Sequence, residues 1–143
     1  MKLQIKILLI ATSLMLYACP DYENEHKYIT FVNKTDKPIA YQEMWSATIS
    51  PADTILADRI GLVIIKENTS SLIANSSHKG GWETDLRGIP YIQFLVTDGD
   101  TYMHYLYEPW DTIRKYVPIL HCYQLTLEDL QRMNWTVVYP PEE

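Results

Sequence analysis

Short apolar runs bounded by turn-forming residues recur along most of the chain, and this pattern is typical of β-strands. Segment 72–74 is ambiguous between strand and loop, and residues 75–88 are rich in Ser, Gly and charged side chains, which indicates a loop. The expected fold is therefore mainly β, an antiparallel β-sandwich-like single domain. The runs predicted to be strands cover residues 28–33, 39–45, 60–66, 91–97, 101–107, 119–125 and 135–139.

Two pairs of these runs are expected to form hairpins. Residues 28–33 and 39–45 flank a segment rich in Asn, Asp, Lys and Pro, which predicts a turn. Residues 91–107 surround Asp98 and Gly99, a pair favoured in two-residue type I′ turns because both central residues need a positive φ. The second hairpin has largely apolar side chains on both faces, which predicts a central position in the fold.

Two short helices are predicted near the C-terminus. The first begins at Pro109, a residue favoured at the first helical position, and must end within two turns because Pro118 follows. The second begins after Thr126, which together with Asp129 forms a short variant of the capping box. This helix is expected to end near Asn134.

The first nineteen residues have the pattern of an export signal. Lys2 and Lys6 provide a basic start, and residues 7–16 form an apolar run that is too short for a membrane-spanning helix, which needs about 20 residues. The sequence Leu-Tyr-Ala-Cys at 16–19 resembles a lipobox, in which an aliphatic and a small residue precede an invariant cysteine. The resemblance implies that Cys19 becomes the acylated N-terminus of the mature protein.

This resemblance divides the chain into residues 1–18 as a lipoprotein signal peptide, 19–27 as an acidic tether and 28–143 as a β-rich domain. Two or three acyl chains hold a soluble domain on a membrane almost permanently, whereas one chain binds only marginally. The membrane is therefore an expected partner, contacted through the lipid. The alternative is an ordinary secretory signal in which Cys19 has no special role.

The tether carries a further pattern, because Asp21, Glu23 and Glu25 follow the cysteine closely. This run is similar to the acidic export signal of surface-exposed lipoproteins of Bacteroidota. The similarity implies an outer membrane lipoprotein on the cell surface. A periplasm-facing position is the alternative, because acidic linkers are also common for reasons of solvation alone.

The C-terminal part of the chain resembles the ending of small uncharacterised lipoproteins of Bacteroidota. The resemblance rests on Trp-Asp-Thr-Ile at 110–113, Tyr-Gln-Leu-Thr-Leu-Glu-Asp-Leu at 123–130 and Asn-Trp-Thr-Val-Val-Tyr-Pro at 134–140. The turn at 31–36 is similar to the start of the same proteins. The resemblance implies an extracytoplasmic β-rich sandwich with small helices, and it implies no activity.

Charge and cysteine content restrict the candidate partners. The formal charge of −6 counts Lys2 and Lys6, so the chain without its signal carries −8. Binding to nucleic acid requires clustered cations, which this acidic chain does not offer, so no nucleic-acid partner is expected. With Cys19 acylated, Cys122 has no partner for an intrachain disulfide, and its apolar neighbours predict a buried thiol.

Local catalytic motifs are missing from the sequence, including a nucleophile elbow, a zinc-protease helix, a Cys-x-x-Cys pair and a glycine-rich phosphate loop. We therefore predict no enzyme and no cofactor. His104 and His121 could contribute to a metal site, but hydrogen-bonded strand histidines are far more common. Glu108 and Asp111 could act as a carboxylate pair, but the start of a helix already accounts for both.

The aromatic content suggests where a ligand could bind. The chain holds 11 Tyr and 4 Trp, which either fit half-buried strands or form an exposed surface for a glycan or a protein. The loop residues His78, Lys79 and Trp82 are further candidates. The predicted function is a non-catalytic, lipid-anchored module that binds a protein, a glycan or an envelope component. The alternative is a small extracytoplasmic hydrolase with a site assembled from residues distant in sequence.

Two copies of one tripeptide match a motif for covalent modification. Asp-Thr-Ile occurs at 53–55 and again at 111–113. The tripeptide is similar to the Asp-(Ser/Thr)-aliphatic motif of protein O-glycosylation in Bacteroidota. Thr54 and Thr112 are therefore candidate O-glycosylation sites.

Overall fold

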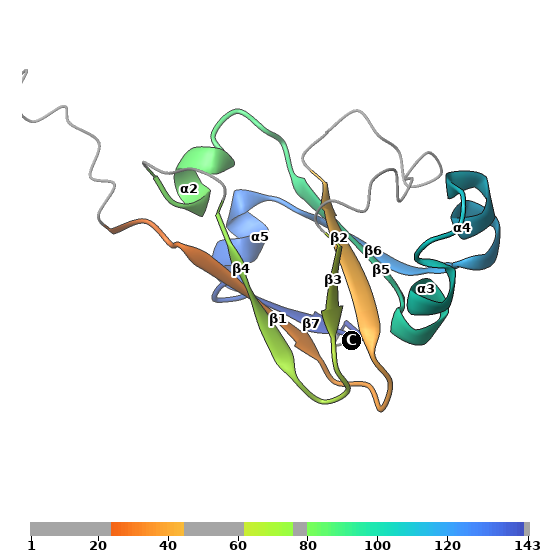
Figure 1. Ribbon diagram of the computed structural model, residues 1–143. Coiled ribbons are helices and arrows are strands. Elements are labelled where there is room, and N and C mark those ends of the chain that lie inside the picture. The colour runs from red at the N-terminus through yellow and green to blue at the C-terminus, as the bar shows by residue number, and fades with distance from the viewer. Residues whose placement is uncertain (1–23, 45–61, 76–79, 142–143) are drawn as a thin grey trace, which may run out of the picture.

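The computed structural model describes residues 24–44, 62–75 and 80–141, which form a mainly β domain (Figure 1). The strands are β1 (Tyr28–Asn33), β2 (Ile39–Met44), β3 (Leu62–Ile65), β4 (Ser70–Ala74), β5 (Ile92–Asp98), β6 (Ile119–Leu125) and β7 (Thr136–Tyr139). The helices are α2 (Trp82–Asp85), α3 (Gly99–Tyr105), α4 (Trp110–Tyr116) and α5 (Leu127–Arg132). The expected mainly β, sandwich-like class is confirmed.

The strands form two sheets that share one core. One sheet has the order β4-β1-β7 and the other β3-β2-β5-β6. All neighbouring strands run antiparallel except β1 and β7, which pair in parallel. Because successive side chains of a strand point to opposite faces, β1 directs Ile29 and Phe31 into the core between the sheets and Thr30 and Val32 away from it.

Aromatic rings from both sheets fill the centre of this core. Phe31 of β1 stacks on Tyr41 of β2, with 4.9 Å between ring centroids. Its ring also meets Phe94 of β5 and Tyr123 of β6 edge to face, at 5.8 and 5.9 Å. These contacts join the two sheets directly, since edge-to-face and offset ring pairs stabilise beyond the area they bury.

A layer of helices covers the second face of the four-stranded sheet. Ala40 of β2 and Leu95 of β5 pack there against Tyr102 of α3 and against Ile113 and Val117 at α4. Strand β5 is therefore buried on both faces, and the central position predicted for this strand is confirmed.

The first predicted hairpin is wrong, because β1 and β2 belong to different sheets. The fully buried side chain of Asn33 organises the corner between them. Its Oδ1 accepts hydrogen bonds from the Thr35 amide and hydroxyl at 2.9 and 2.7 Å. Its Nδ2 lies within hydrogen-bond distance of three carbonyl oxygens, those of Lys37, Ile65 and Lys66, at 2.7, 3.3 and 3.1 Å. The segment that resembles a hairpin turn is thus a crossover from one sheet to the other.

The second predicted hairpin is also wrong, because β5 is followed by α3 and pairs with β2 and β6. Asp98 caps the helix by accepting a hydrogen bond from the Thr101 amide at 2.7 Å. Gly99 is needed for a close approach, since an added Cβ would come within 2.8 Å of the Pro38 carbonyl oxygen. The Asp-Gly pair therefore serves a helix start that contacts the corner.

The helices predicted near the C-terminus are confirmed with small shifts. Pro109 is the N-cap of α4 rather than its first helical residue. Thr126 and Asp129 form the expected capping box at the start of α5. Helix α5 ends at Arg132, and Asn134 then adopts a φ of 49° as the chain turns into β7.

Two further segments differ from the prediction: residues 72–74, which precede the expected loop, and residues 82–85 within it. The ambiguous segment 72–74 belongs to β4. Residues 82–85 form the short helix α2, and the Trp82 side chain is fully buried in the core between the sheets. The burial of a large aromatic residue explains why part of this polar stretch becomes ordered. Residues 45, 60 and 61 of the predicted strands lie outside the described residues.

Candidate functional site

The structure places some of the sequence-predicted site residues and leaves others untested. The candidates that lie outside the described residues are Cys19, Asp21, Glu23, Trp45, Thr54, His78 and Lys79. Trp82 is a core residue, so its expected role as a loop residue for binding is wrong.

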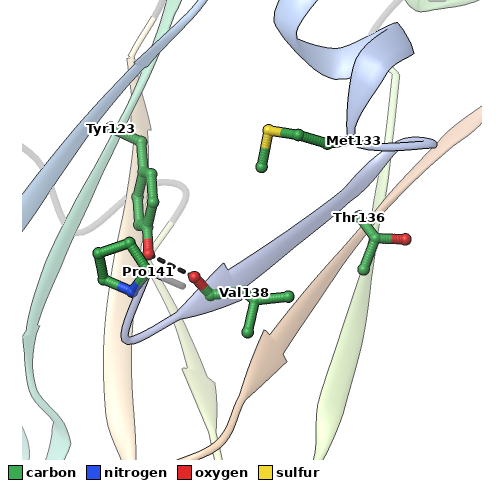
Figure 2. Close-up of a pocket in the computed structure, with 5 residues that line it drawn as sticks. All are labelled: Tyr123, Met133, Thr136, Val138 and Pro141. Carbon is green, nitrogen blue, oxygen red and sulfur yellow. Dashed lines mark hydrogen bonds between the residues drawn. The ribbon is translucent and has the colours of Figure 1, made fainter. Parts of the chain in front are cut away.

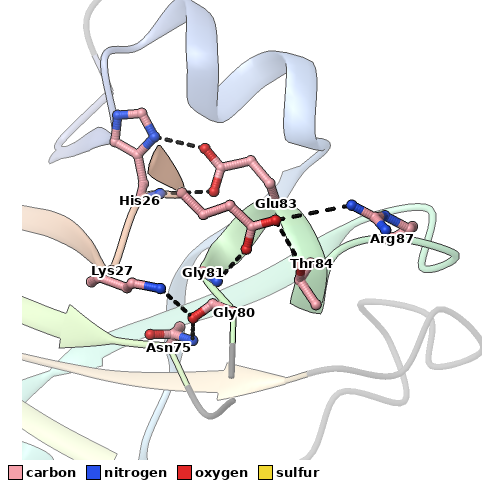
Figure 3. Close-up of polar contacts among 9 residues, drawn as sticks. His26, Lys27, Asn75, Gly80, Gly81, Glu83, Thr84 and Arg87 are labelled. Carbon is pink, nitrogen blue, oxygen red and sulfur yellow. Dashed lines mark hydrogen bonds and ion pairs between the residues drawn. The ribbon is translucent and has the colours of Figure 1, made fainter. Parts of the chain in front are cut away.

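Glu25, expected in the tether, contacts the folded domain (Figure 3). One carboxylate oxygen accepts a hydrogen bond from the Gly81 amide, and the other accepts one from the Thr84 hydroxyl at 2.7 Å. The Arg87 guanidinium lies 3.9 Å away. The hydrogen bonds from Thr84 and Gly81 lower the pKa of Glu25, and the charge of Arg87 adds to this effect.

The next two residues extend this attachment (Figure 3). His26 donates its backbone N–H to Glu83 at 2.8 Å, places Nδ1 2.7 Å from the other oxygen of that carboxylate, and stacks its ring on Trp135 at 4.3 Å. Lys27 donates to the Gly80 carbonyl oxygen at 2.8 Å. We call residues 25–27 and their partners on segment 80–87 the N-terminal clasp.

Gly81 makes the clasp possible. A Cβ at this position would lie 2.5 Å from the Glu25 Cβ and 2.5 Å from the His26 carbonyl oxygen. Contacts this short do not occur between real atoms, so any larger residue would push the N-terminal segment away. The attachment of residues 25 and 26 to the domain therefore depends on a glycine far away in sequence.

The two histidines proposed as a metal pair have different surroundings. His104 is exposed on α3 and meets the Tyr105 ring edge to face at 4.8 Å. His121 lies on β6 and meets the Tyr123 ring at 4.4 Å. Among residues 24–44, 62–75 and 80–141, no group of three metal-ligating side chains could hold an ion.

The remaining candidates occupy ordinary structural positions. Glu108 is exposed ahead of α4, and Asp111 is exposed in its first turn. Thr112 is half-buried in α4, where its backbone N–H donates to the Pro109 carbonyl oxygen. Cys122 is half-buried beside the helical layer, and burial raises the pKa of its thiol. Thr112 stays a prediction as a modification site.

The aromatic side chains divide into core and surface groups. Tyr28, Tyr107 and Tyr116 are 55%, 84% and 48% exposed, whereas the rings of the core are buried. Tyr28 begins β1 beside the clasp, while Tyr116 in α4 stacks on Tyr105 of α3 at 5.3 Å. The exposed rings therefore lie on different parts of the domain.

A cavity of about 450 Å³ lies between β7, β6 and the end of α5 (Figure 2). Its polar side chains already have partners: the Tyr123 hydroxyl donates to the Val138 carbonyl oxygen at 2.5 Å, and the Thr136 hydroxyl donates to the Asn134 carbonyl oxygen at 3.2 Å. The lining is otherwise apolar and consists of Tyr123, Met133, Thr136, Val138 and Pro141.

A second cavity, of about 360 Å³, lies where the chain crosses between the sheets, and we call it the corner cavity. Asp98 lines it, and the hydrogen bonds from Thr101 lower the pKa of this carboxyl, helped by the charge of Lys37. Burial raises the pKa of Tyr139, and the negative charge of Asp98 adds to the effect. Lys37, Asp98 and Tyr139 are thus within electrostatic reach of one another. The lining residues are Thr35, Asp36, Lys37, Pro38, Ile39, Asp98, Leu120 and Tyr139.

The clasp and the corner cavity lie at opposite ends of β1. The strand begins at Tyr28, next to the clasp, and ends at Asn33, which organises the corner (Figure 1). At about 3.3 Å per residue, the six residues of β1 separate the two regions by roughly 20 Å. Sequence reasoning missed this cavity because its lining comes from four separate segments.

Comparison of the chain with protein-family models, with curated proteins and with solved structures finds no match. In the described ranges, none of the helices has the length and apolar character needed to cross a membrane.

We predict that the clasp loses stability in acid. A carboxyl whose pKa is lowered in the folded state stabilises the fold above its unfolded pKa, and this contribution disappears as pH falls. In urea denaturation, Glu25→Gln should lower the unfolding midpoint at pH 7, and the difference from wild type should shrink below about pH 4.5, the ordinary glutamate value. Glu67→Gln, at an exposed position of the β3–β4 turn, is the control. A Glu25→Gln midpoint equal to wild type at pH 7 would contradict the clasp.

Proposed function

We propose that this protein is a lipid-anchored, non-catalytic binding module on the outer surface of a bacterial envelope. The observation that supports binding most directly is the corner cavity, with its charged side chains, at the end of the domain opposite the clasp. A domain anchored at one end presents a cavity at the other end to its surroundings.

The length of the connection to the anchor supports this orientation. Six peptide units join Cys19 to Glu25, and an extended chain spans at most about 3.6 Å per residue. If Cys19 carries the lipid, the clasp stays within roughly 20 Å of the membrane surface. The corner cavity then lies on the side of the domain that is directed away from the anchor.

The clasp also limits which acidic residues can serve as the proposed export signal. The carboxylate of Glu25 is used in hydrogen bonds to Gly81 and Thr84. We therefore assign recognition by the export machinery to Asp21 and Glu23, which precede the clasp. A domain that faces the periplasm is the alternative location.

The hydrolase alternative has one specific observation in its favour, since Asp36 and Asp98 line the same cavity. Acid–base catalysis by a carboxyl pair requires one carboxyl with a raised pKa, which can donate a proton near neutral pH. Hydrogen bonds from Thr101 lower the pKa of Asp98, so this carboxyl is unsuited to be the proton donor, and its side chain is already used as the cap of α3. These properties favour binding over hydrolysis.

Acylation of Cys19 tests the anchoring half of the proposal. Metabolic labelling with an alkyne fatty acid should mark the wild-type protein and leave Cys19→Ser unlabelled. Cys122→Ser is the matched control and should keep the label, because the side chain of Cys122 lies within the folded domain. Label retained in Cys19→Ser would overturn the lipid anchor.

Recovery of a partner tests the binding half. The immobilised wild-type protein should retain a component of a detergent-solubilised envelope extract, and Lys37→Met should lose it. Thr136→Val, in the other cavity, should retain it. Equal recovery by the three proteins would contradict a role for the corner cavity, and chemical conversion of the retained component by wild type but not by Asp36→Asn would favour the hydrolase.

A further inference from the structure

The two cavities differ in the polar groups that they offer to a ligand. In the cavity beside α5, the hydroxyls of Tyr123 and Thr136 are already used in hydrogen bonds to backbone carbonyls. The corner cavity instead carries two carboxylates and one ammonium group, from Asp36, Asp98 and Lys37. A ligand that forms directed hydrogen bonds is therefore better matched to the corner cavity.

The fold fixes the backbone of Lys37 and the side chain of Asp98. The Lys37 carbonyl oxygen accepts hydrogen bonds from the Asn33 amide and the Thr35 hydroxyl, which hold its backbone at the cavity wall. Asp98 is held by its hydrogen bond to the Thr101 amide. A carboxylate accepts about four hydrogen bonds, so Asp98 keeps acceptor capacity for a ligand. The cavity thus presents a prearranged acceptor, and the exposed Lys37 side chain lies within electrostatic reach of it.

Apolar groups complete the lining. Leu120 at the start of β6 is 45% exposed and lines the cavity together with Pro38 and Tyr139. These side chains offer a ligand an apolar surface next to the charged groups. The site therefore combines one apolar wall with hydrogen-bonding groups of both kinds.

This combination restricts the chemistry of the ligand. A purely apolar ligand would cover the charged groups of Lys37 and Asp98 without offering them hydrogen bonds, which is costly. A polyanion is disfavoured by the two carboxylates and by the net charge of the chain, −6. A sugar ring has hydroxyls that both donate and accept around its edge, and it has an apolar face of C–H groups.

We propose that the corner cavity binds a saccharide, with Lys37 and Asp98 hydrogen-bonding its hydroxyls and Tyr139 and Leu120 contacting the apolar face of the ring. The inference rests on the proposed binding function and names its ligand class. The volume of about 360 Å³ lies at the small end of the range for ligand sites, so one or two sugar units occupy the cavity.

Amide NMR spectra of the mature protein, purified from membranes in detergent micelles, test this proposal. The ligands are the methyl glycosides of mannose, galactose, glucose and N-acetylglucosamine, and glycerol is the control that has hydroxyls but no ring. At least one glycoside should shift the amides of residues 35–37, Ile39, Leu120 and Tyr139 in a saturable manner, and glycerol should not.

Two variants then test the assigned contacts. Asp98→Asn removes the charge but keeps a side chain that caps a helix equally well, so α3 should remain intact. Asp98→Asn and Lys37→Met should each weaken glycoside binding about tenfold, or ~1.4 kcal/mol. Thr136→Val should bind like wild type.

The outcomes separate this inference from the binding function itself. Shifts confined to Thr136 and Met133 would overturn the assignment of the cavity, and no shift with any glycoside would overturn the ligand class. If no glycoside binds but the envelope extract still yields a component that Lys37→Met loses, the saccharide fails and the binding function stands. If neither occurs, both fail.

Discussion

The buried amide of Asn33 is the interaction on which the arrangement of the two sheets depends. It ends β1, closes a tight turn through Thr35, and holds its Nδ2 within hydrogen-bond distance of the carbonyl oxygens of Lys37, Ile65 and Lys66. A hydrogen bond contributes about 0.5–1.5 kcal/mol net, and this one buried side chain joins the crossing from β1 to β2 to the crossing from β3 to β4. Because β1 and β2 are directed into different sheets at this point, Phe31 faces Tyr41 across the core instead of lying beside it in one sheet.

The same corner determines where a ligand can bind. Gly99 brings the start of α3 against the Pro38 carbonyl, and this contact places Asp98 beside Lys37 and Tyr139. The other end of β1 is attached to α2 by the clasp, which depends on Gly81. The fold thus separates an attachment end from a candidate binding end, and this separation is the physical basis of the proposed function.

The sequence predicted the features that local interactions determine. The capping box of Thr126 and Asp129 and most of the strand runs depend on neighbours within a few residues, and the structure confirms them, but the run at 101–107 is wrong because Gly99–Tyr105 form α3. Strand pairing was mispredicted at both proposed hairpins, because Asn33 acts through carbonyls more than thirty residues away and Gly99 is required by a tertiary contact rather than by a positive φ. The corner cavity could not be predicted, since its lining side chains come from segments brought together only by the crossover. The pattern at Glu25 likewise indicated a tether, because its partners lie more than fifty residues further along the chain.

The measurement that tests the role of this corner most directly is the free energy of unfolding of Asn33→Ala, determined by urea denaturation. An m-value equal to that of wild type shows that the substitution changes stability alone. The substitution removes the five hydrogen-bond contacts of a fully buried side chain, so we expect a loss of about 3–5 kcal/mol. Asn75→Ala is the matched control, since the Asn75 amide donates to the Gly80 carbonyl oxygen at a half-buried site away from the corner. Its loss should be about 1 kcal/mol. An Asn33→Ala variant that is no less stable than Asn75→Ala would contradict the central role of this corner.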